Sequence, residues 1–271
     1  MANKSELVVK ANTLVEACYR LTLAEQRIML YAITEARRTQ KGLNAEDFVT
    51  IRATEYAKQF SLDSTTAYEQ ISEAAETIFN RYVTFHDTDQ GTKKLQRTKV
   101  RWISAASYID DAGTIRINFS RHIVPFITRL ESEFTRYKLA QISNMTSGHA
   151  IRIYELLIQW GSVGKREIEI EWLRRTLMLE EKHSRTTDLR KWVIDVGVSQ
   201  INEHTDLNVT YTQRKTGRNV THLIFTFGPK PTPETNQKKR RSKCRECKQK
   251  TIDRTKAQVI QDQRLSLRLT D

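Results

Sequence analysis

The stretch Thr186–His204, TTDLRKWVIDVGVSQINEH, decides the fold of this chain. Its apolar residues, from Val193 to Ile201, recur at helical spacing, and Arg190 and Lys191 stand just ahead of them. The flanking segments read as a helix, a strand, a further helix and a ribbon strand: HAIRIYELLIQW (149–160), EIEI (167–170), WLRRTLML (172–179) and NVTYT (208–212). This order predicts one compact unit in which three helices and a strand precede a β-ribbon.

The same order of elements occurs a second time, about 120 residues earlier. It reads AEQRIMLYAITEA (24–36), FVTI (48–51), ATEYAKQFSL (53–62) and TTAYEQISEAAETIFNRYVTF (65–85). Two helices joined by a tight turn and followed by a ribbon describe a winged helix. The sequence therefore predicts an α+β chain of two tandem winged-helix domains that form a pseudo-repeat. We expect domains at residues 1–142 and 143–228, followed by a basic tail at 229–271.

The connections carry further expectations. Ser120–Ser147 is too apolar for a flexible linker, so we expect a helix packed between two rigidly related domains. Strands of the first ribbon are expected near Val100–Ser107 and Thr114–Asn118. The second ribbon is expected at Leu207–Thr212 and Val220–Phe227, flanking a loop tip with three cations, 213–219.

The net charge of +13 favours a polyanionic partner, and nucleic acid is the commonest one. The segment from Pro229 onward holds 13 Lys and Arg against 5 acids, and its polar composition predicts disorder until it meets a partner. No stretch approaches the roughly 18 apolar residues of a membrane span, and the polar N-terminus lacks the core of a signal peptide. We therefore expect a cytoplasmic protein with no membrane contact.

Patterns that would indicate a metal or a catalytic site are incomplete. Cys244 and Cys247 have the spacing of half a zinc site, but no Cys or His follows them, which favours solvated thiols. The six histidines never form the His-apolar-His motif of a nicking replication protein. Gly161–Lys165 lacks the first glycine of a P-loop. We expect no metal, no cofactor and no enzymatic activity.

Leu7, Leu14, Leu21 and Ile28 recur at seven-residue spacing and would form one apolar seam on a continuous helix. The seam is short, and Asn12 and Thr13 resemble a helix cap. A core-facing role is favoured over a leucine zipper, although a dimer contact could use the same face.

A helix-turn-helix places its second helix in the major groove, where side chains near its N-terminus reach base edges. In the second domain Arg185 and Arg190 are candidates for bidentate contacts to guanine, and Lys182 and Lys191 fit phosphate or guanine. The alternative for each of these four cations is that it is a solvated charge at the end of the helix and makes no DNA contact. The remaining candidates are two threonines of the helix and three cations of the wing: Thr186, Thr187, Arg214, Lys215 and Arg218.

The first domain is chemically different. Its corresponding helix offers hydrogen-bonding groups without positive charge: Thr65, Thr66, Tyr68 and Gln70. Its cations lie in the ribbon, where they suit contacts to phosphate that do not depend on sequence, and include Lys93, Lys94 and Arg97. The second domain should therefore carry most of the specificity.

Three separated stretches resemble one known family. They are NTLVEACYRLTLAEQRIMLYAI (12–33), INFSRHIVPFITRLESEFTRYKLAQISNMTSGHAIRIYELLIQW (117–160) and DLRKWVIDVGVSQIN (188–202) with TGRNVTHLIFTF (216–227). Together they resemble the initiator Rep proteins of theta-replicating, iteron-containing plasmids, such as that of the F plasmid. Arg190 and Lys191 match the family's basic cluster, and Trp192 stands where some relatives carry a third Arg.

The resemblance implies a plasmid replication initiator whose monomer binds double-stranded DNA at origin iterons. It implies opening of an adjacent AT-rich segment and recruitment of the host initiator and replicative helicase. It also implies a dimer, formed through the first winged helix, that binds an operator inverted repeat and represses its own promoter. A winged-helix transcriptional repressor without a replication role is the competing hypothesis, and both fit the charges and the helices.

Overall fold

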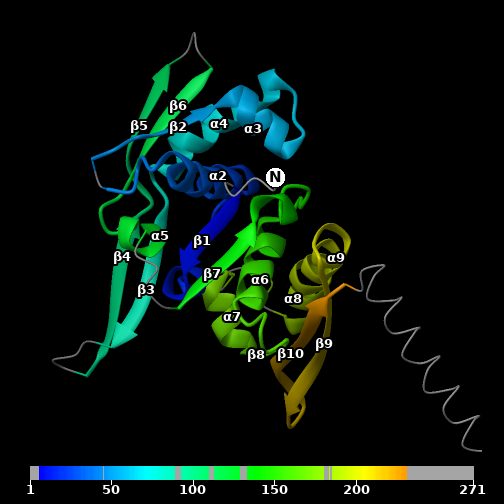
Figure 1. The fold of residues 1–271 in the computed structure, drawn as a ribbon. Helices are drawn as coiled ribbons and strands as arrows, with labels where there is room; N and C mark the ends of the chain where they lie inside the picture. Colours follow the sequence, from blue (N-terminus) through cyan, green and yellow to red (C-terminus); the bar gives the residue numbers. More distant parts are fainter. Residues whose placement is uncertain are drawn as a thin grey trace, which may run out of the picture. The chain divides into compact units, whose positions relative to one another are not determined.

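The computed structural model describes residues 6–44, 46–88, 93–109, 113–128, 133–179, 183 and 185–230, and Figure 1 shows one arrangement built twice within them. The first domain comprises α2 (Leu23–Thr39), β2 (Val49–Arg52), α3 (Ala53–Phe60), α4 (Ser64–Ile78), β5 (Ile103–Ile109) and β6 (Thr114–Phe119). Its strands form an antiparallel sheet in the order β2-β6-β5.

The second domain repeats this plan with α6 (Gly148–Ile158), β8 (Lys165–Glu169), α7 (Ile170–Thr176), α8 (Thr186–Leu189), a π-helical turn η3 (Arg190–Ile194), α9 (Asp195–His204), β9 (Leu207–Thr216) and β10 (Asn219–Pro229). Its sheet has the order β8-β10-β9. In both domains the strand after the first helix therefore pairs with the last strand of the ribbon. This shared topology confirms the predicted pair of winged helices and their pseudo-repeat.

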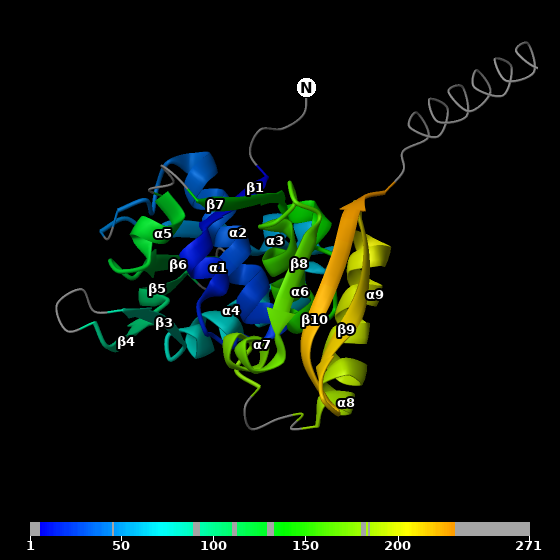
Figure 2. The same ribbon diagram turned by 90° about the horizontal axis from the view of Figure 1, so that it is seen from below.

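Two additions extend the first domain. A hairpin of β3 (Tyr82–Thr88) and β4 (Leu95–Arg101) is inserted between α4 and β5. At the N-terminal side, β1 (Leu7–Ala11) pairs antiparallel with β7 (Phe134–Lys138) and leads into α1 (Asn12–Glu16). Figure 2 shows α1 close to α6, and the two helices are in contact.

The connecting segment Ser120–Ser147 is not the single helix that we expected. Its described residues form α5 (Val124–Thr128), β7 and a short 3-10 turn, η2 (Leu139–Gln141). The reason lies in the pattern of β7, where Thr135 and Tyr137 are buried while their neighbours are exposed. That period of two is typical of a strand. The helix prediction rested on the many apolar residues of the whole segment and did not take this alternation into account.

The ribbons also differ from the predicted boundaries. Val100 and Ser107 belong to different sheets, because Trp102, only 1% exposed, enters the core between β4 and β5. The cations expected on the first ribbon therefore flank or lie on the β3–β4 hairpin, not on the β5–β6 wing. In the second ribbon the tip shrinks to Gly217 and Arg218, because β9 and β10 continue almost to each other.

The seven-residue seam is not a seam on one helix. Leu7 lies in β1, Leu14 in α1, Leu21 in the following loop and Ile28 in α2. A capping box starts α2: the Glu25 backbone N–H donates to the Thr22 hydroxyl, and the Thr22 backbone N–H donates to the Glu25 carboxylate. Leu14 and Ile28 are 0% and 1% exposed, so within one chain they are core residues.

A buried ionic cluster joins β1, α6 and β7. The Glu155 carboxylate lies 2.5 Å from Lys10 Nζ and 3.3 Å from Arg152 Nη1. It also accepts hydrogen bonds from the hydroxyls of Tyr137 (2.6 Å) and Tyr19 (3.4 Å). Lys10, Glu155 and Arg152 are each at most 3% exposed. The cluster therefore fixes the first helix of the second domain against the N-terminal strand.

No helix among the described residues is long and apolar enough to span a bilayer.

Candidate nucleic-acid interface

The second domain's candidate DNA-contacting helix consists of α8, η3 and α9, which follow one another without a break. Its buried face includes Leu189, Val193 and Ile201, which pack in the core. Gly197 lies against α6, where an added Cβ would stand 2.7 Å from Ile153 Cδ1. The opposite side of the helix stays in solvent and presents Thr187, Arg190, Lys191 and Trp192, with Thr186 half-buried.

A π-helical turn lies in the exposed part of this helix. Its closing hydrogen bond runs from the Asp195 backbone N–H to the Arg190 carbonyl, five residues back. Arg190, Lys191 and Trp192, the first three residues of this turn, are exposed in succession. Lys191 Nζ lies 4.6 Å from the centre of the Trp192 ring. Two cations and an aromatic ring therefore form one continuous exposed group.

Asp195 connects this group to the wing, and sequence reasoning missed it. Its carboxylate lies 4.0 Å from Arg190 Nε and accepts a 2.5 Å hydrogen bond from the Tyr211 hydroxyl on β9. Burial of the phenol and this hydrogen bond both raise the pKa of Tyr211. A spacing of five residues does not bring side chains together on an α-helix. Only the π-helical turn makes the contact between Arg190 and Asp195 possible.

The wing places its three cations differently. Arg214 Nη1 lies 2.7 Å from the Glu167 carboxylate on β8, so part of its charge is compensated. Lys215 is exposed on the next position of β9, and Arg218 occupies the two-residue turn after Gly217, whose φ is 64°. Glycine at the first position of such a turn is typical of a tight hairpin. In Figures 1 and 2 the N-terminal end of the helix and the tip of the wing point the same way.

The loop ahead of the helix is only partly described. Lys182 lies outside the described residues. Arg185 precedes the first turn and is exposed, and its carbonyl accepts the backbone N–H groups of Asp188 and Leu189. Arg174 on α7 donates to the carbonyl of His183 and so ties that residue to α7.

In the first domain the predicted residues do lie at the start of α4. Asp63 caps this helix by accepting the Thr66 backbone N–H (2.9 Å), and hydrogen bonds from Thr66 lower the pKa of its carboxyl group. Thr65 is exposed, whereas Tyr68 and Gln70 are half-buried. Beyond its first turn, the exposed positions of α4 include the acids Glu69, Glu73 and Glu76.

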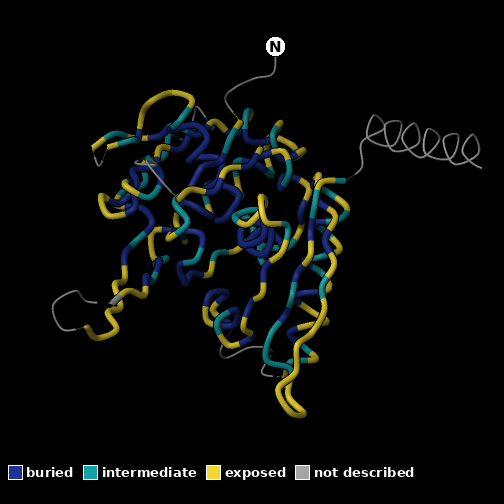
Figure 3. The backbone as a smooth tube through the Cα atoms, turned by 60° about the horizontal axis from the view of Figure 1, so that its bottom comes forward, coloured by how far each residue is buried: buried dark blue, intermediate teal, exposed yellow. Residues whose placement is uncertain are grey.

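The remaining predicted cations of the first domain lie apart from α4. Lys93 and Lys94 precede β4, and Arg97 lies within it, all three exposed. The β3–β4 hairpin extends away from α3 and α4 in Figure 1, and Figure 3 shows that the ends of this hairpin and of the β9–β10 wing are exposed. The structure therefore gathers the described second-domain candidates into one surface but separates those of the first domain into two.

Among the described residues, no three His, Cys, Asp or Glu side chains cluster as metal ligands would. Cys244 and Cys247 lie outside the described residues.

Comparison with known proteins identifies the family. Residues 7–158 match the family described as "Initiator Replication protein, WH1", and residues 169–227 match "Initiator Rep protein, WH2". This chain is a member of that initiator family. The initiator is thus grouped with replication proteins, not with a class of enzymes.

One sequence relative and one solved structure each align with most of this initiator, and a second structure aligns with part of it. An Escherichia coli protein described as an uncharacterized 27.6 kDa protein is 24% identical over 238 residues, which cover 84% of this chain and 98% of that protein. The Pi initiator protein, solved in complex with iteron DNA, has a TM-score of 0.71 at 20% identity and covers 85% of this chain and 100% of its own. The WH1 domain of MSBI1.176, a replication protein isolated from a multiple sclerosis patient, is 40% identical over 41% of this chain and 83% of its own, with a TM-score of 0.36.

Proposed function

We propose that this initiator binds directly repeated sequences in duplex DNA at a plasmid origin, as a monomer, mainly through its second winged helix. The observation that carries the proposal is the exposed group of Arg190, Lys191 and Trp192 beside a cationic wing. Membership in the initiator family and the fold shared with an iteron-binding initiator support the same reading.

The chemistry of each side chain suggests its part in this contact. Arg190 and Arg185 carry planar guanidinium groups that match the O6 and N7 acceptors of guanine in the major groove. Lys191 and the wing cations Lys215 and Arg218 suit phosphate oxygens, because a point charge needs no base-specific geometry. The first domain adds phosphate contacts from Thr65 and Thr66 and from the lysines ahead of β4. We assign the main reading role to residues 143–228 and a secondary one to residues 1–142.

The finer steps extend the proposal. The bound initiator promotes opening of the adjacent AT-rich segment and recruits the host initiator and the replicative helicase, in the cytoplasm and on plasmid DNA. A dimer represses the initiator's own promoter from an inverted repeat. A repressor without a replication role would make similar DNA contacts, but the family match is to initiators.

Dimerisation through Leu7, Leu14, Leu21 and Ile28 would require a rearrangement of the first domain, and not only contact between two exposed surfaces. Leu14 and Ile28 are already buried within one chain, so they could meet a partner only after the first domain rearranges. Monomer and dimer would then be alternative packings of the same apolar residues. A polar substitution at Leu14 would damage the core and cannot report on dimerisation alone, whereas the half-buried Leu21 can be tested by sedimentation.

The direct test compares Arg190→Ala with Arg136→Ala, which removes another exposed cation, on β7 and away from the proposed surface. Binding is measured by fluorescence anisotropy on a duplex carrying the direct repeats beside the gene and on an unrelated duplex. Arg190→Ala should weaken repeat binding by about 1–3 kcal/mol and relax preference at one base pair. Equal losses on both duplexes would reduce Arg190 to a phosphate contact.

A further inference from the structure

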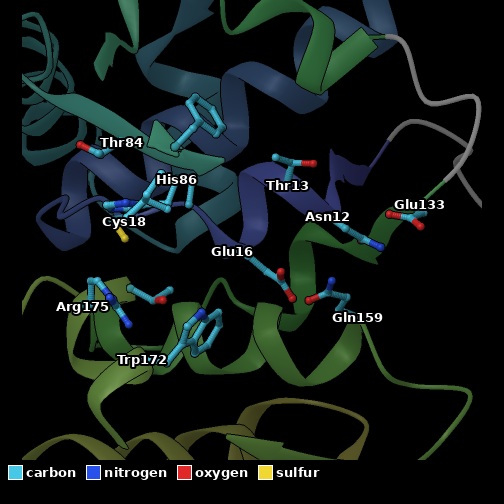
Figure 4. Close-up of a pocket in the computed structure, with 14 residues that line it drawn as sticks. Asn12, Thr13, Glu16, Cys18, Thr84, His86, Glu133, Gln159, Trp172 and Arg175 are labelled. Carbon is cyan, nitrogen blue, oxygen red and sulfur yellow. The ribbon is translucent and has the colours of Figure 1, made fainter. Parts of the chain in front are cut away.

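A cationic cleft lies between the β3–β4 hairpin of the first domain and α7 of the second. It has a volume of about 270 Å³ and is lined by Cys18, Thr84, His86, Arg97, Lys99, Arg175 and Met178. A neighbouring pocket of about 390 Å³, drawn in Figure 4, shares Cys18, Thr84, His86 and Arg175. None of the DNA contacts proposed above, apart from Arg97, involves these residues.

The strand register directs the hairpin cations into this cleft. Thr84 is opposite Lys99 and His86 is opposite Arg97, so these four residues share one face of the hairpin. The other face carries Val83, whose side chain is buried, with Phe85 and Val100. Because that face packs in the core, the polar face points away from it, and its four residues line the cleft together with Arg175 of α7. Lys99 Nζ lies 4.2 Å from the centre of the Tyr82 ring, which steadies it without neutralising its charge.

Arg175 approaches the same space from the second domain. Its neighbours Arg174 and Thr176 are buried, whereas Arg175 is exposed. In Figure 4 Arg175 lies across the opening from Cys18 and His86. Among the described residues, no carboxylate forms an ion pair with Arg97, Lys99 or Arg175.

The nearest described acids do not neutralise the cleft. Glu16 lines the neighbouring pocket, but its carboxylate lies 2.8 Å from Arg166 Nη2. Glu133 lines the same pocket but not the cleft, and Figure 4 places it at the opposite end of that pocket from Arg175. Asp87 lines a separate pocket on the other face of the hairpin. The cations that line the cleft therefore face one another across it.

We propose that this cleft binds a backbone phosphate of duplex DNA and thereby clamps the two winged helices onto one strand. The inference rests on the proposed DNA-binding function. A polyanion fits better than a small phosphate compound, because Arg97, Lys99 and Arg101 continue as a row along β4 at spacings of roughly 6.7 Å. Arg97, Lys99 and Arg175 would share the phosphate, so the contact is independent of base sequence and requires both domains in place.

The test uses the full-length protein and a fluorescent duplex of unrelated sequence, titrated at several salt concentrations. Arg175→Ala and Lys99→Ala should each lower the slope of log affinity against log salt by up to about 0.9, the value expected for one lost phosphate contact. The double variant should lose less affinity than the product of the two single losses, because both residues hold the same group. Arg175→Lys should restore most of the binding.

The matched controls are Arg136→Ala and Lys138→Ala, which remove exposed cations of β7 outside the cleft. The proposal would be overturned if Arg175→Ala and Lys99→Ala each changed the salt slope no more than these controls do. It would also be overturned if the affinity losses of the two single variants multiplied independently in the double variant. A variant that loses binding of inorganic tripolyphosphate while holding the duplex normally would overturn it too, since that outcome indicates a small-anion site.

The outcome can be separated from that of the proposed function. If wild-type protein prefers no repeat but the cleft variants still lower the salt slope, only the origin-binding proposal fails. If Arg190→Ala lowers repeat preference while Arg175→Ala changes nothing, only the cleft fails. Thermal melting of each variant checks that an exposed substitution has left the fold intact.

Discussion

At the scale of single residues, the contact between Asp195, Arg190 and Tyr211 determines how the helix and the wing meet. One carboxylate orients a cation on the helix and a phenol on β9. The same negative charge repels the phosphates of any nearby duplex. Asp195 therefore has opposite effects on the geometry and on the charge of the proposed DNA surface.

We expect Asp195→Ala to reduce the ratio of repeat to unrelated-duplex affinity several-fold. Affinity for the unrelated duplex should stay equal or rise, because a negative charge has been removed. Tyr211→Phe serves as a control that removes the hydrogen bond but keeps the carboxylate, and it should change the ratio less. A parallel fall in both affinities after Asp195→Ala would mean that the residue supports only the fold.

The residues of this surface were predictable to different degrees. Arg190 and Lys191 could be placed from sequence, because apolar residues at helical spacing mark the buried face of the helix and so indicate which residues are exposed on the opposite face. The contact of Asp195 with Arg190 could not be predicted, because it depends on a π-helical turn. The helical spacing of the apolar residues does not indicate such a turn. Lys99 and Arg175 were likewise not recognised as partners, because their approach depends on packing between domains.

At the scale of elements, the N-terminal strand and the helix α6 are joined by the buried ionic cluster around Glu155. Burial alone would raise the pKa of this carboxyl group, but Lys10 and Arg152 outweigh it and lower the pKa below its ordinary value. Its contribution to stability is therefore fully present above the unfolded-state pKa, about 4.3. That contribution is lost as the pH falls through the lower folded-state pKa.

We expect Glu155→Gln to destabilise the fold at pH 7 by about 3–5 kcal/mol, because it leaves two cations buried without an anion. The variant should also lose less stability than wild type when the pH is lowered below about 4.3. Urea denaturation at several pH values measures both effects. Glu171→Gln is the control, since this carboxylate is 76% exposed and pairs with Arg174 at 3.6 Å. Equal acid sensitivity in Glu155→Gln and wild type would contradict this role.

The element order was predictable because each domain repeats it with clear helical and strand periodicities. The prediction of a helix over Ser120–Ser147 was wrong, because apolar recurrence does not distinguish buried strands from buried helices when the two alternate over short distances. Leu7 and Leu14 share a spacing with Ile28 yet lie in a strand, a short helix and a long helix. The β1–β7 pairing joins segments more than 100 residues apart, and no local pattern indicates it.

At the scale of the whole molecule, the two winged helices share a topology but not a surface chemistry. The second presents cations on its helix and wing, whereas the first presents hydroxyl groups on α4 and cations on the hairpin. The tail beyond Pro229 adds 13 Lys and Arg against 5 acids, and its structure and role stay a prediction.

Removing residues 229–271 should lower the salt dependence of DNA affinity more than the preference for the repeat sequence. A segment without a defined fold contacts phosphates through charge and carries little base-specific geometry. Anisotropy titrations of the shortened and full-length chains at matched salt concentrations measure both quantities. Unchanged affinity at low salt would assign the tail to a partner other than DNA.

The central claim is that the second winged helix reads a repeated duplex sequence. Footprinting of the full-length initiator on the DNA beside its gene tests it most directly. We predict protection of several direct repeats next to an AT-rich run, in a pattern that Arg190→Ala weakens at one position of every repeat. Uniform protection along the fragment, unaltered by Arg190→Ala, would contradict the claim.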